Sequence, residues 1–402
     1  MSLPVLPLPD EASCPFGPHP EIDALREHRP LTRVRCPAAG IEAWLVTDYA
    51  DVREVLGDSR RFSSSGGATG HLLASTPPDS PVEEGDFARM DGADHVRFRH
   101  LFAPAVGTAK RMAEIRPMVQ RIVDEAIDEL AGQAHPIDLH EQFAKPVTTA
   151  VIGELLGVPA GDRKIFHRTA EAQFDNETTI DEFSAAKQPL FEYVQDLITQ
   201  RRAEPADDAI SIMIERGADF SDLELVKMAS GLLVGGYDAT AALIAHGVLA
   251  LLEEPAQLAL LRENPDVVPG AVEEVVRLLG ATTGMLRIAV TDTEIAGTPI
   301  AAGDYLVAML QAANHDPAQF PDPGRLDLRR DNRRQLGFGF GAHLCVGRQL
   351  ARLELAVVLG TLFRRISGLR LAVPIDRIPF KRNSPITGPD RLLVTWDEIR
   401  PA

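Results

Sequence analysis

The chain has 402 residues, of which 45% are hydrophobic and 25% are charged, and its 58 acidic and 41 basic residues give a formal net charge of −17. So acidic a chain is a poor general partner for nucleic acid or anionic lipid, because both are negatively charged. The three cysteines, Cys14, Cys36 and Cys345, lack zinc-ligand spacing and are too few for a disulfide framework, which favours a reducing compartment.

The N-terminal arm, about residues 1–20, contains six prolines and no basic segment of the kind that begins a signal peptide. No uninterrupted apolar run of membrane-spanning length follows it, so the sequence predicts a cytoplasmic protein. Residues 44–58 are expected to begin as a strand and continue as a helix, and residues 111–132 and 186–202 to form amphipathic helices. No linker divides the chain, and we expect residues 1–402 to form one mostly α-helical domain with minor β-structure.

The segment of residues 63–92 has no apolar periodicity and is rich in Gly, Ser, Pro and Asp. A loop of this length in a compact protein is usually functional or disordered. It is therefore either a lid over a binding site or a mobile surface loop.

The longest predicted helix begins after Ser221, which with Glu224 forms a capping box, and it ends before Pro255. Its length is about 32 residues, or ~48 Å, and because it is apolar on nearly every face it should be central and buried. Its middle reads LLVGGYDATAA. The paired glycines would let a flat group lie against the backbone, and Asp238 either faces solvent or is held beside that group.

Two further regions are expected to form strands. Residues 288–310 alternate apolar and polar residues between glycine turns. The C-terminal segments LRLAVP and LLVTW have the same character.

Cys345 lies in the glycine-rich loop 336–347, just before the helical run RQLARLELAVVL. A helix N-terminus lowers the pKa of a thiol, and glycines such as Gly339, Gly341 and Gly347 let backbone N–H groups approach a large ligand. A lone cysteine is more often a small buried hydrophobe, and GFGFG is also found in dinucleotide loops. The βαβ unit that a dinucleotide loop requires is not indicated here, so the pattern favours a metal-bound thiolate.

This loop resembles the haem-binding loop of the cytochrome P450 family at Phe338, Gly339, Gly341, His343, Cys345 and Gly347. The resemblance spans almost the whole chain and points to the soluble, actinomycete-like bacterial class that uses a separate ferredoxin. It implies the P450 fold, a single large helical unit with small sheets and a long central helix. It also implies haem b with the Cys345 thiolate as axial ligand.

Other motifs of the family occur in the same order along the chain. Glu274 and Arg277 resemble its E-x-x-R pair, a structural element for which Arg325 is the expected third partner. The resemblance also implies four partners for the haem propionates, because buried carboxylates need charged donors: His95, Arg99, Arg287 and His343.

One departure from the family concerns proton delivery. Most members have a threonine where this chain has Ala239, in Gly235-Gly236-Tyr237-Asp238-Ala239. Thr240 follows but lies about 100° further round the helix, so it is not expected to replace that hydroxyl simply. Three hypotheses remain open: a substrate hydroxyl or a water held by substrate and Asp238 fills the gap, the reaction is an atypical oxidation such as aryl or C–C coupling, or ordered water alone suffices.

The family's substrate contacts correspond here to the 63–92 loop, the long helix, the segment Thr282–Leu286 and the turn at 384–388. The expected pocket residues are Gly231, Val234, Gly235, Thr283, Met285, Leu286 and Ile386. Their apolar and small side chains favour a sizeable natural-product intermediate, such as a polyketide, terpenoid or small cyclic peptide.

No flavin or iron–sulfur motif is visible, so the resemblance implies a ferredoxin and its reductase as electron donors. Arginines near the cysteine loop are either the docking face or a solvated run of charge: Arg329, Arg330, Arg333, Arg334, Arg348 and Arg352. A monomer without nucleic-acid or membrane partners is expected.

The leading hypothesis is thus a haem-thiolate monooxygenase of secondary metabolism that hydroxylates or epoxidises its substrate. The alternatives are a P450 that couples or cyclises its substrate, a peroxide-driven P450, and a haem-binding sensor or carrier without turnover.

Overall fold

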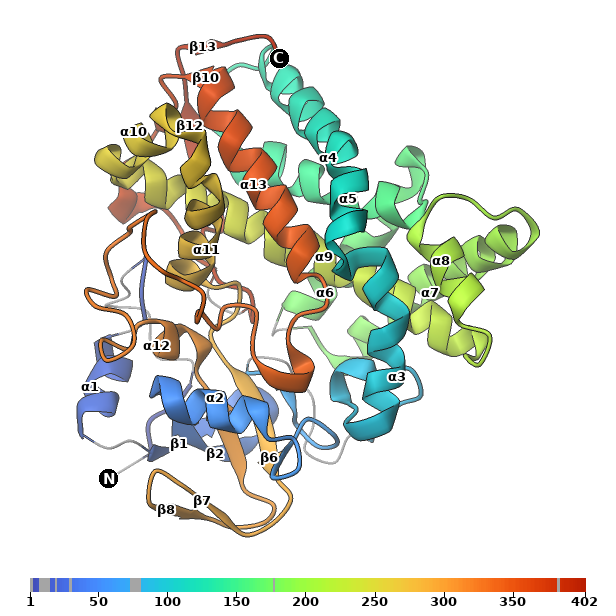
Figure 1. Cartoon of the computed structure of the whole chain (residues 1–402), viewed down its shortest axis with the longest axis vertical. Helices are drawn as coiled ribbons and strands as arrows, with labels where there is room; N and C mark the ends of the chain where they lie inside the picture. The colour runs from blue at the N-terminus through green and yellow to red at the C-terminus, as the bar shows by residue number, and fades with distance from the viewer. Residues whose placement is uncertain are drawn as a thin grey trace.

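The computed structural model describes residues 3–6, 15–18, 20–28, 31–72, 81–175, 178–381 and 384–402. Cys14, most of the N-terminal arm and residues 73–80 of the predicted lid lie outside these ranges. Figure 1 shows a helix-rich body joined to a smaller part that contains the main sheet near the N-terminus. The predicted fold class, mostly α with small sheets, is therefore confirmed.

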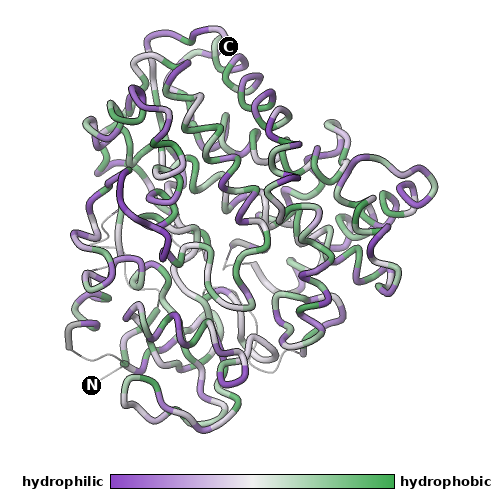
Figure 2. The backbone as a smooth tube through the Cα atoms, in the orientation of Figure 1, coloured by the Kyte–Doolittle hydropathy of each residue, from purple (hydrophilic) through white to green (hydrophobic). Residues whose placement is uncertain are grey.

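The helices surround one long element, α9. In chain order the α-helices are α1 (Pro20–His28), α2 (Tyr49–Gly57), α3 (Gly92–Phe102), α4 (Ala109–Leu130), α5 (Lys145–Leu156), α6 (His167–Phe174), α7 (Ile180–Ala203), α8 (Ala209–Arg216), α9 (Asp222–Glu253), α10 (Pro255–Glu263), α11 (Val268–Leu279), α12 (Leu310–Asn314) and α13 (Arg348–Arg365). Hydrophobic and hydrophilic residues alternate along α4 in Figure 2, as the predicted amphipathic helix requires.

The main sheet has six strands in the order β1-β2-β9-β6-β3, and β4 also pairs with β6. Its strands are β1 (Leu31–Cys36), β2 (Ile41–Val46), β3 (Phe62–Ser63), β4 (Gly70–His71), β6 (Met285–Ala289) and β9 (Tyr305–Ala308). The smaller sheets use β5 (Ile137–Asp138), β7 (Thr293–Ile295), β8 (Thr298–Ile300), β10 (Ile366–Ser367), β11 (Arg370–Leu371), β12 (Leu393–Thr395) and β13 (Glu398–Ile399). Strands were thus correctly predicted in residues 288–310 and in both C-terminal segments.

Helix α9 has the predicted position and ends. Ser221 accepts a hydrogen bond from the N–H of Glu224 and the Glu224 side chain accepts one from the N–H of Ser221, so the capping box is complete. The helix is long and apolar enough to cross a membrane by composition, but 83% of its most apolar window is buried inside the protein. It is therefore the core helix that the sequence predicts, and α5, α6, α7, α11 and α13 all pack against it.

The 63–92 segment is more ordered at its start than the sequence suggests. Within it β4 pairs antiparallel with β6, so that His71 lies opposite Met285. At its C-terminal end Glu83 pairs with Lys227 of α9 at 2.9 Å. The described parts of this loop are therefore tied to the sheet and to the central helix.

The E-x-x-R pair is confirmed, but its third partner was predicted wrongly. Glu274 and Arg277 on α11 are both fully buried and form an ion pair at 2.7 Å. The second arginine on Glu274 is Arg330, at 3.2 Å, whereas the Arg325 side chain is exposed and only its carbonyl reaches Arg277. The chain turns between these residues, so that Arg330 rather than Arg325 points inward.

Candidate functional site

A cavity of about 700 Å³ lies between α9, the 336–347 loop and strand β6. Cys345 opens onto it from one side, and Ala239 and Thr240 of α9 line its wall. Much of its remaining lining is apolar and comes from α7, α9 and α13, whereas α3 contributes only His95 and Arg99. It therefore combines one accessible thiol with a large apolar enclosure.

The glycines of the cysteine loop are required by backbone geometry. Gly339 and Gly341 have φ angles of 77° and 73°, in the left-handed region that favours glycine. A Cβ at Gly341 would lie 2.5 Å from the carbonyl oxygen of Leu56 at the end of α2. The N–H of Cys345 donates to the carbonyl of Phe338 at 2.9 Å, which closes the turn around the sulfur.

The charge of the Cys345 sulfur is set by opposing effects. The side chain is open to the cavity but enclosed by protein on its other sides, and this burial raises the pKa of the thiol. The backbone N–H groups of Gly347 and Arg348, and the charges of Arg348 and Arg99, act in the opposite direction and lower that pKa. A metal ion bound at the sulfur would deprotonate the thiol outright.

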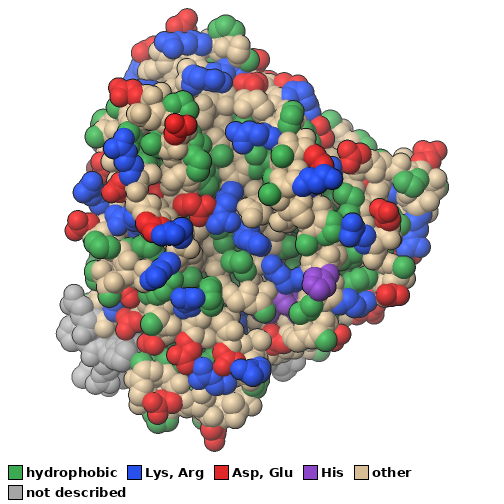
Figure 3. All heavy atoms as spheres, viewed as in Figure 1, with side chains coloured by type: hydrophobic (Ala, Val, Ile, Leu, Met, Phe, Trp, Pro, Cys, Tyr) green, Lys and Arg blue, Asp and Glu red, His purple; other side chains and the backbone are tan. Residues whose placement is uncertain are grey.

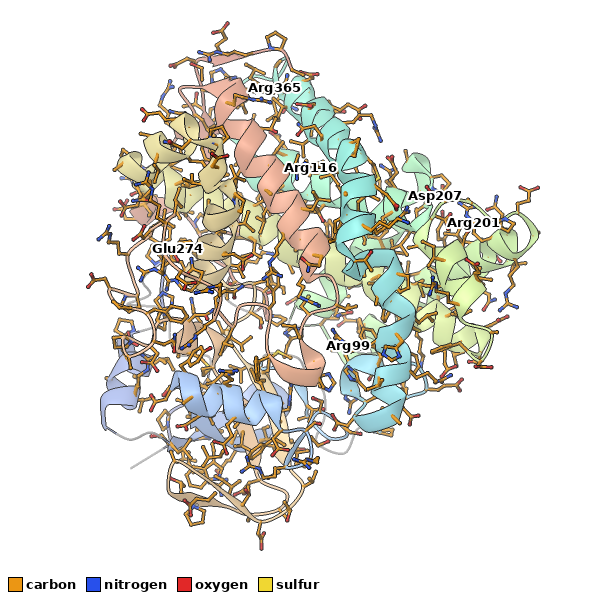
Figure 4. All side chains as sticks on the ribbon, in the orientation of Figure 1. Arg99, Arg116, Arg201, Asp207, Glu274 and Arg365 are labelled. Carbon is orange, nitrogen blue, oxygen red and sulfur yellow. The ribbon has the colours of Figure 1, made fainter. Side chains whose placement is uncertain are left out.

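All four predicted propionate partners, His95, Arg99, Arg287 and His343, line the cavity. Burial, with the nearby charges of His343 and Arg99, lowers the pKa of His95 to about 4, and the rings of His95 and His343 stack with centroids 4.0 Å apart. Arg99 on α3 points toward the cysteine loop (Figure 4) and donates to the carbonyl of Leu344 at 2.6 Å.

Arg287 is the strongest sign of an anionic ligand. It is 3% exposed, and burial lowers the pKa of its guanidinium to about 10. Within the described ranges it forms no ion pair, and its guanidinium donates a hydrogen bond to the carbonyl of Leu286 at 2.8 Å. Burying an unpaired cation is costly, so this wall is built to receive a negative charge.

The sequence analysis missed Asp91, which organises this wall. Its carboxylate accepts from Ser63 Oγ and the N–H of Ser64 and lies 3.2 Å from Nε2 of His343. Burial opposes ionisation of Asp91, but the hydrogen bonds from His343 and both serines outweigh it and lower the carboxyl pKa. Because Asp91 occupies Nε2 of His343, that histidine has less freedom to bind a propionate than its position implied. Only the position of Asp91 directly before α3 could have indicated this role.

Haem fits this set of residues. The cavity offers a thiol on one side, a buried arginine without an ion pair in the described ranges, and apolar walls. Carboxylates of the propionate type would complete the interactions of Arg287, Arg99 and His95. Gly235 faces open space, since an added Cβ would meet no atom within 4 Å, whereas one at Gly236 would lie 2.9 Å from Ile152. The two glycines thus have separate roles, one leaving room in the cavity and the other admitting α5.

Asp238 fits neither of the two positions expected from the sequence, because it faces neither solvent nor the cavity. Gly235, Ala239 and Thr240 line the wall, but Asp238 is turned away and is 7% exposed. Nζ of Lys381 donates to its Oδ2 at 2.6 Å, and Nε2 of His140 lies 3.9 Å from its Oδ1. Lys381 is 143 positions away in sequence, so no local pattern could have indicated this pair.

Only some of the predicted substrate-contact residues reach the cavity, and strand geometry explains why Leu286 does not. Gly231, Val234, Met285 and Ile386 line the cavity, but Thr283 and Leu286 do not. Side chains alternate across a strand, and Leu286 on β6 points into the core on the opposite face of the sheet. In place of Thr283 the wall contains Thr282, whose Oγ1 lies 3.2 Å from Nδ1 of the half-buried His71.

Comparisons with known proteins agree with this geometry. The cytochrome P450 family model matches residues 166–369. The nocardicin C N-oxygenase of Nocardia uniformis subsp. tsuyamanensis is 40% identical over 398 residues, which cover 96% of this chain and 99% of that protein. The mycinamicin IV hydroxylase/epoxidase of Micromonospora griseorubida is 39% identical over 379 residues, which cover 92% of this chain and 94% of that protein. A crystal structure of CYP105P1 in complex with filipin I has a TM-score of 0.91 at 39% identity and covers 99% of this chain and 100% of its own.

These relatives are oxygenases, so the alternative of a haem sensor or carrier without turnover is set aside. The resemblance drawn from the cysteine loop, the haem cofactor and the enzyme class are confirmed. The chain therefore belongs to the cytochrome P450 family, as a haem-thiolate monooxygenase similar to soluble actinomycete enzymes, with Cys345 as the axial cysteine.

Proposed function

We propose that this enzyme hydroxylates or epoxidises an apolar natural-product intermediate in the cytoplasm, with electrons from a ferredoxin. The observation that carries the proposal is the large apolar cavity onto which Cys345 opens. Relatives named for such substrates support it, among them the mycinamicin IV hydroxylase/epoxidase and the pentalenic acid synthase. Polyketides and terpenoids are accordingly the first compound classes to test.

Bound haem supplies the redox centre at which dioxygen is activated, and the chain supplies its setting. Cys345 would hold the iron through its thiolate, and Arg287, Arg99 and His95 would hold the propionates. Apolar residues such as Val234, Met285 and Ile386 exclude bulk water and position the carbon to be oxidised.

Proton delivery in this enzyme must proceed without the usual hydroxyl at position 239. Asp238 is held by Lys381, so it does not donate directly from its present position. Water, a substrate hydroxyl and Thr240 are the groups that can contact the cavity beside Ala239. This gap also makes an oxidative coupling outcome the second candidate reaction, because coupling does not require oxygen insertion.

The arginines predicted to dock a ferredoxin differ in whether they already form ion pairs within this protein. Arg352 is bound to Glu273 at 2.5 Å and lies over Phe338, and Arg330 is committed to Glu274. Arg333 pairs locally with Asp331. Arg348 donates to the carbonyl of Cys345 but has no ion pair within the described ranges. Lys and Arg side chains spread across the middle of the face in Figure 3, which supports docking of an acidic protein on this face. Arg348, which follows the cysteine loop and has no ion pair in the described ranges, is the arginine to test.

The direct test is an absorbance titration of the haem-loaded protein with natural-product intermediates. A compound that binds in the cavity beside Cys345 and excludes water from the haem iron would shift the Soret band to shorter wavelength. A shifting compound that is then converted by ferredoxin, reductase and dioxygen to an oxygenated product supports the proposal. Conversion to a coupled or cyclised product without added oxygen identifies the second candidate.

A further inference from the structure

The cavity reaches solvent beside helix α7, which packs against the central helix α9 (Figure 1). Glu83, Asp175 and Thr179 line it there and are exposed, and we call this end the mouth of the cavity. Further along α7, Leu190 is fully buried. Lys187 lies between Thr179 and Leu190 on the helix and is a half-buried part of the same lining. Its charge therefore faces whatever enters the cavity.

Two aromatic rings of the same helix flank the ammonium group of Lys187. Its Nζ lies 5.4 Å from the ring centroid of Phe183 and 5.4 Å from that of Phe191, one helical turn before and after it. Both rings line the cavity as well. Contact with the face of a ring attracts a cation but leaves its strong hydrogen-bond donors available. The rings thus hold the ammonium at the mouth without satisfying it.

Two other cations that the described chain places at this end of the lining already have acidic partners. Lys227 of α9 pairs with Glu83 at 2.9 Å, and Arg89 lies 3.6 Å from Asp86. The hydrogen bond from Lys227 and the more distant charge of Lys187 both lower the pKa of Glu83. Lys187 itself forms no ion pair with any residue that the structure describes. It is therefore the cation at the mouth that remains for a ligand.

The acidic residues at the mouth leave room for an anion. Glu83 and Asp86 belong to the pairs just described, and burial raises the pKa of the Asp86 carboxyl, which weakens its charge further. Asp175 is exposed, where solvent weakens its interactions, and it accepts a hydrogen bond from Thr178 at 3.4 Å. A half-buried ammonium beside two apolar rings interacts more strongly with an opposite charge than an exposed group does. An incoming anion is thus attracted chiefly to Lys187.

We propose that the substrate carries an acidic group, such as a carboxylate, which binds Lys187 at the mouth while its apolar skeleton extends toward Cys345. The ammonium donates to the anion, and the rings of Phe183 and Phe191 cover the adjoining carbon atoms. Anchoring one end of the substrate also fixes which of its carbon atoms lies nearest the thiolate. The inference names the substrate class of the monooxygenase function proposed above and rests on that function.

Two pairs of probes with different shapes test the charge directly. Dehydroabietic acid and its methyl ester share a rigid tricyclic terpenoid skeleton, and dodecanoic acid and methyl dodecanoate share a flexible chain. Their affinities for the haem-loaded protein are measured by Soret titration and, independently of the haem spectrum, by isothermal titration calorimetry. Wild type should bind each acid about five- to tenfold more tightly than its ester, and added salt should reduce this preference.

Variants at position 187 then assign the preference to one side chain. Lys187→Met should abolish the preference for acids, and Lys187→Arg should keep it. Lys110→Met is the matched control, because the Lys110 side chain is 88% exposed on α4 and does not line the cavity. The inference is overturned if neither acid binds, if the acids bind no more tightly than their esters, or if the preference survives in Lys187→Met. Acids that bind through Lys187 but are not oxygenated with ferredoxin, reductase and dioxygen would support the anion site and contradict the proposed function instead.

Discussion

Nζ of Lys381 lies 2.6 Å from Oδ2 of Asp238, and both side chains are largely withdrawn from solvent. The pair ties the middle of the central helix to the C-terminal part of the chain. It also explains why the acidic residue of the long-helix motif faces away from the cavity. The orientation of Asp238 is thus a consequence of its partner.

Replacing Lys381 by Met should destabilise the protein by about 3 kcal/mol, because it leaves a buried carboxylate without its cation. Denaturant unfolding monitored by far-UV circular dichroism measures this. Lys381→Arg keeps the charge and should recover most of the loss. An unchanged unfolding midpoint in Lys381→Met would show that the ion pair contributes nothing.

The Ala239→Thr variant tests how protons reach the cavity. If cavity water supplies them in place of the hydroxyl, restoring that hydroxyl should change the product yield per electron pair by less than about twofold, well below the ~1.4 kcal/mol that corresponds to a tenfold effect. Product and peroxide are measured together for one converted substrate. A marked rise in product with a fall in peroxide would show instead that the missing hydroxyl limits the enzyme, and Thr240→Val shows whether its neighbour already replaces it.

Arg287→Leu should weaken haem retention. Its guanidinium is buried without an ion pair in the described structure, and a charge-assisted hydrogen bond contributes about 1.5–3 kcal/mol, or roughly tenfold or more in affinity. Transfer of haem from the protein to apomyoglobin measures the loss rate. Arg60→Leu is the control, because the Arg60 side chain is 93% exposed and away from the cavity. Equal loss rates in the two variants would mean that Arg287 does not hold the cofactor.

Charge reversal at Arg348 should slow reduction by an acidic ferredoxin, and the difference from wild type should shrink as salt is added. Stopped-flow reduction at several ionic strengths measures the rate for each protein and the dependence of that rate on salt. Arg352→Glu should chiefly reduce stability, because it places a like charge against Glu273. If Arg348→Glu is reduced as fast as wild type at low salt, the docking face lies elsewhere.

Two buried histidines should make the protein acid-sensitive. His246 and His315 bind backbone carbonyls of Pro15 and Phe16, and burial lowers the pKa of each to about 4 from 6.5. Between pH 6.5 and pH 4 these histidines bind protons in the unfolded chain but not in the folded one. The free energy of unfolding therefore has its full value above about pH 6.5 and decreases as the pH falls toward 4.

The loss is about 3 kcal/mol for each histidine. Urea unfolding at a series of pH values should show that the free energy of unfolding decreases between pH 6.5 and pH 4. In His246→Phe the slope of this free energy against pH should be smaller by the amount that corresponds to one bound proton. A stability that does not change over this range would contradict the assignment.

The sequence predicted what depends on local chemistry. The ends of α9 follow from the Ser221–Glu224 capping box, and the turn around Cys345 follows from glycines that the backbone requires. Alternation along β6 could also have excluded Leu286, because Met285 and Leu286 are neighbours on one strand and cannot share a face.

What could not be predicted depends on contacts between distant segments. Lys381 meets Asp238, and Asp91 meets His343, only after the chain has folded. Likewise, the choice of Arg330 over Arg325 as partner of Glu274 is made by the path of an irregular segment. Composition and spacing carry no information about which of two nearby arginines turns inward.

The contact between Gly341 and Leu56 bears on how such an enzyme can be modified. Any side chain at position 341 would strike the end of α2 and displace the turn that presents the sulfur. A substitution in this loop would thus displace the cysteine directly and would change the substrate pocket only indirectly. Directed evolution toward new substrates should therefore leave the cysteine loop fixed and mutate the opposite walls, at Gly231, Val234, Met285 and Ile386.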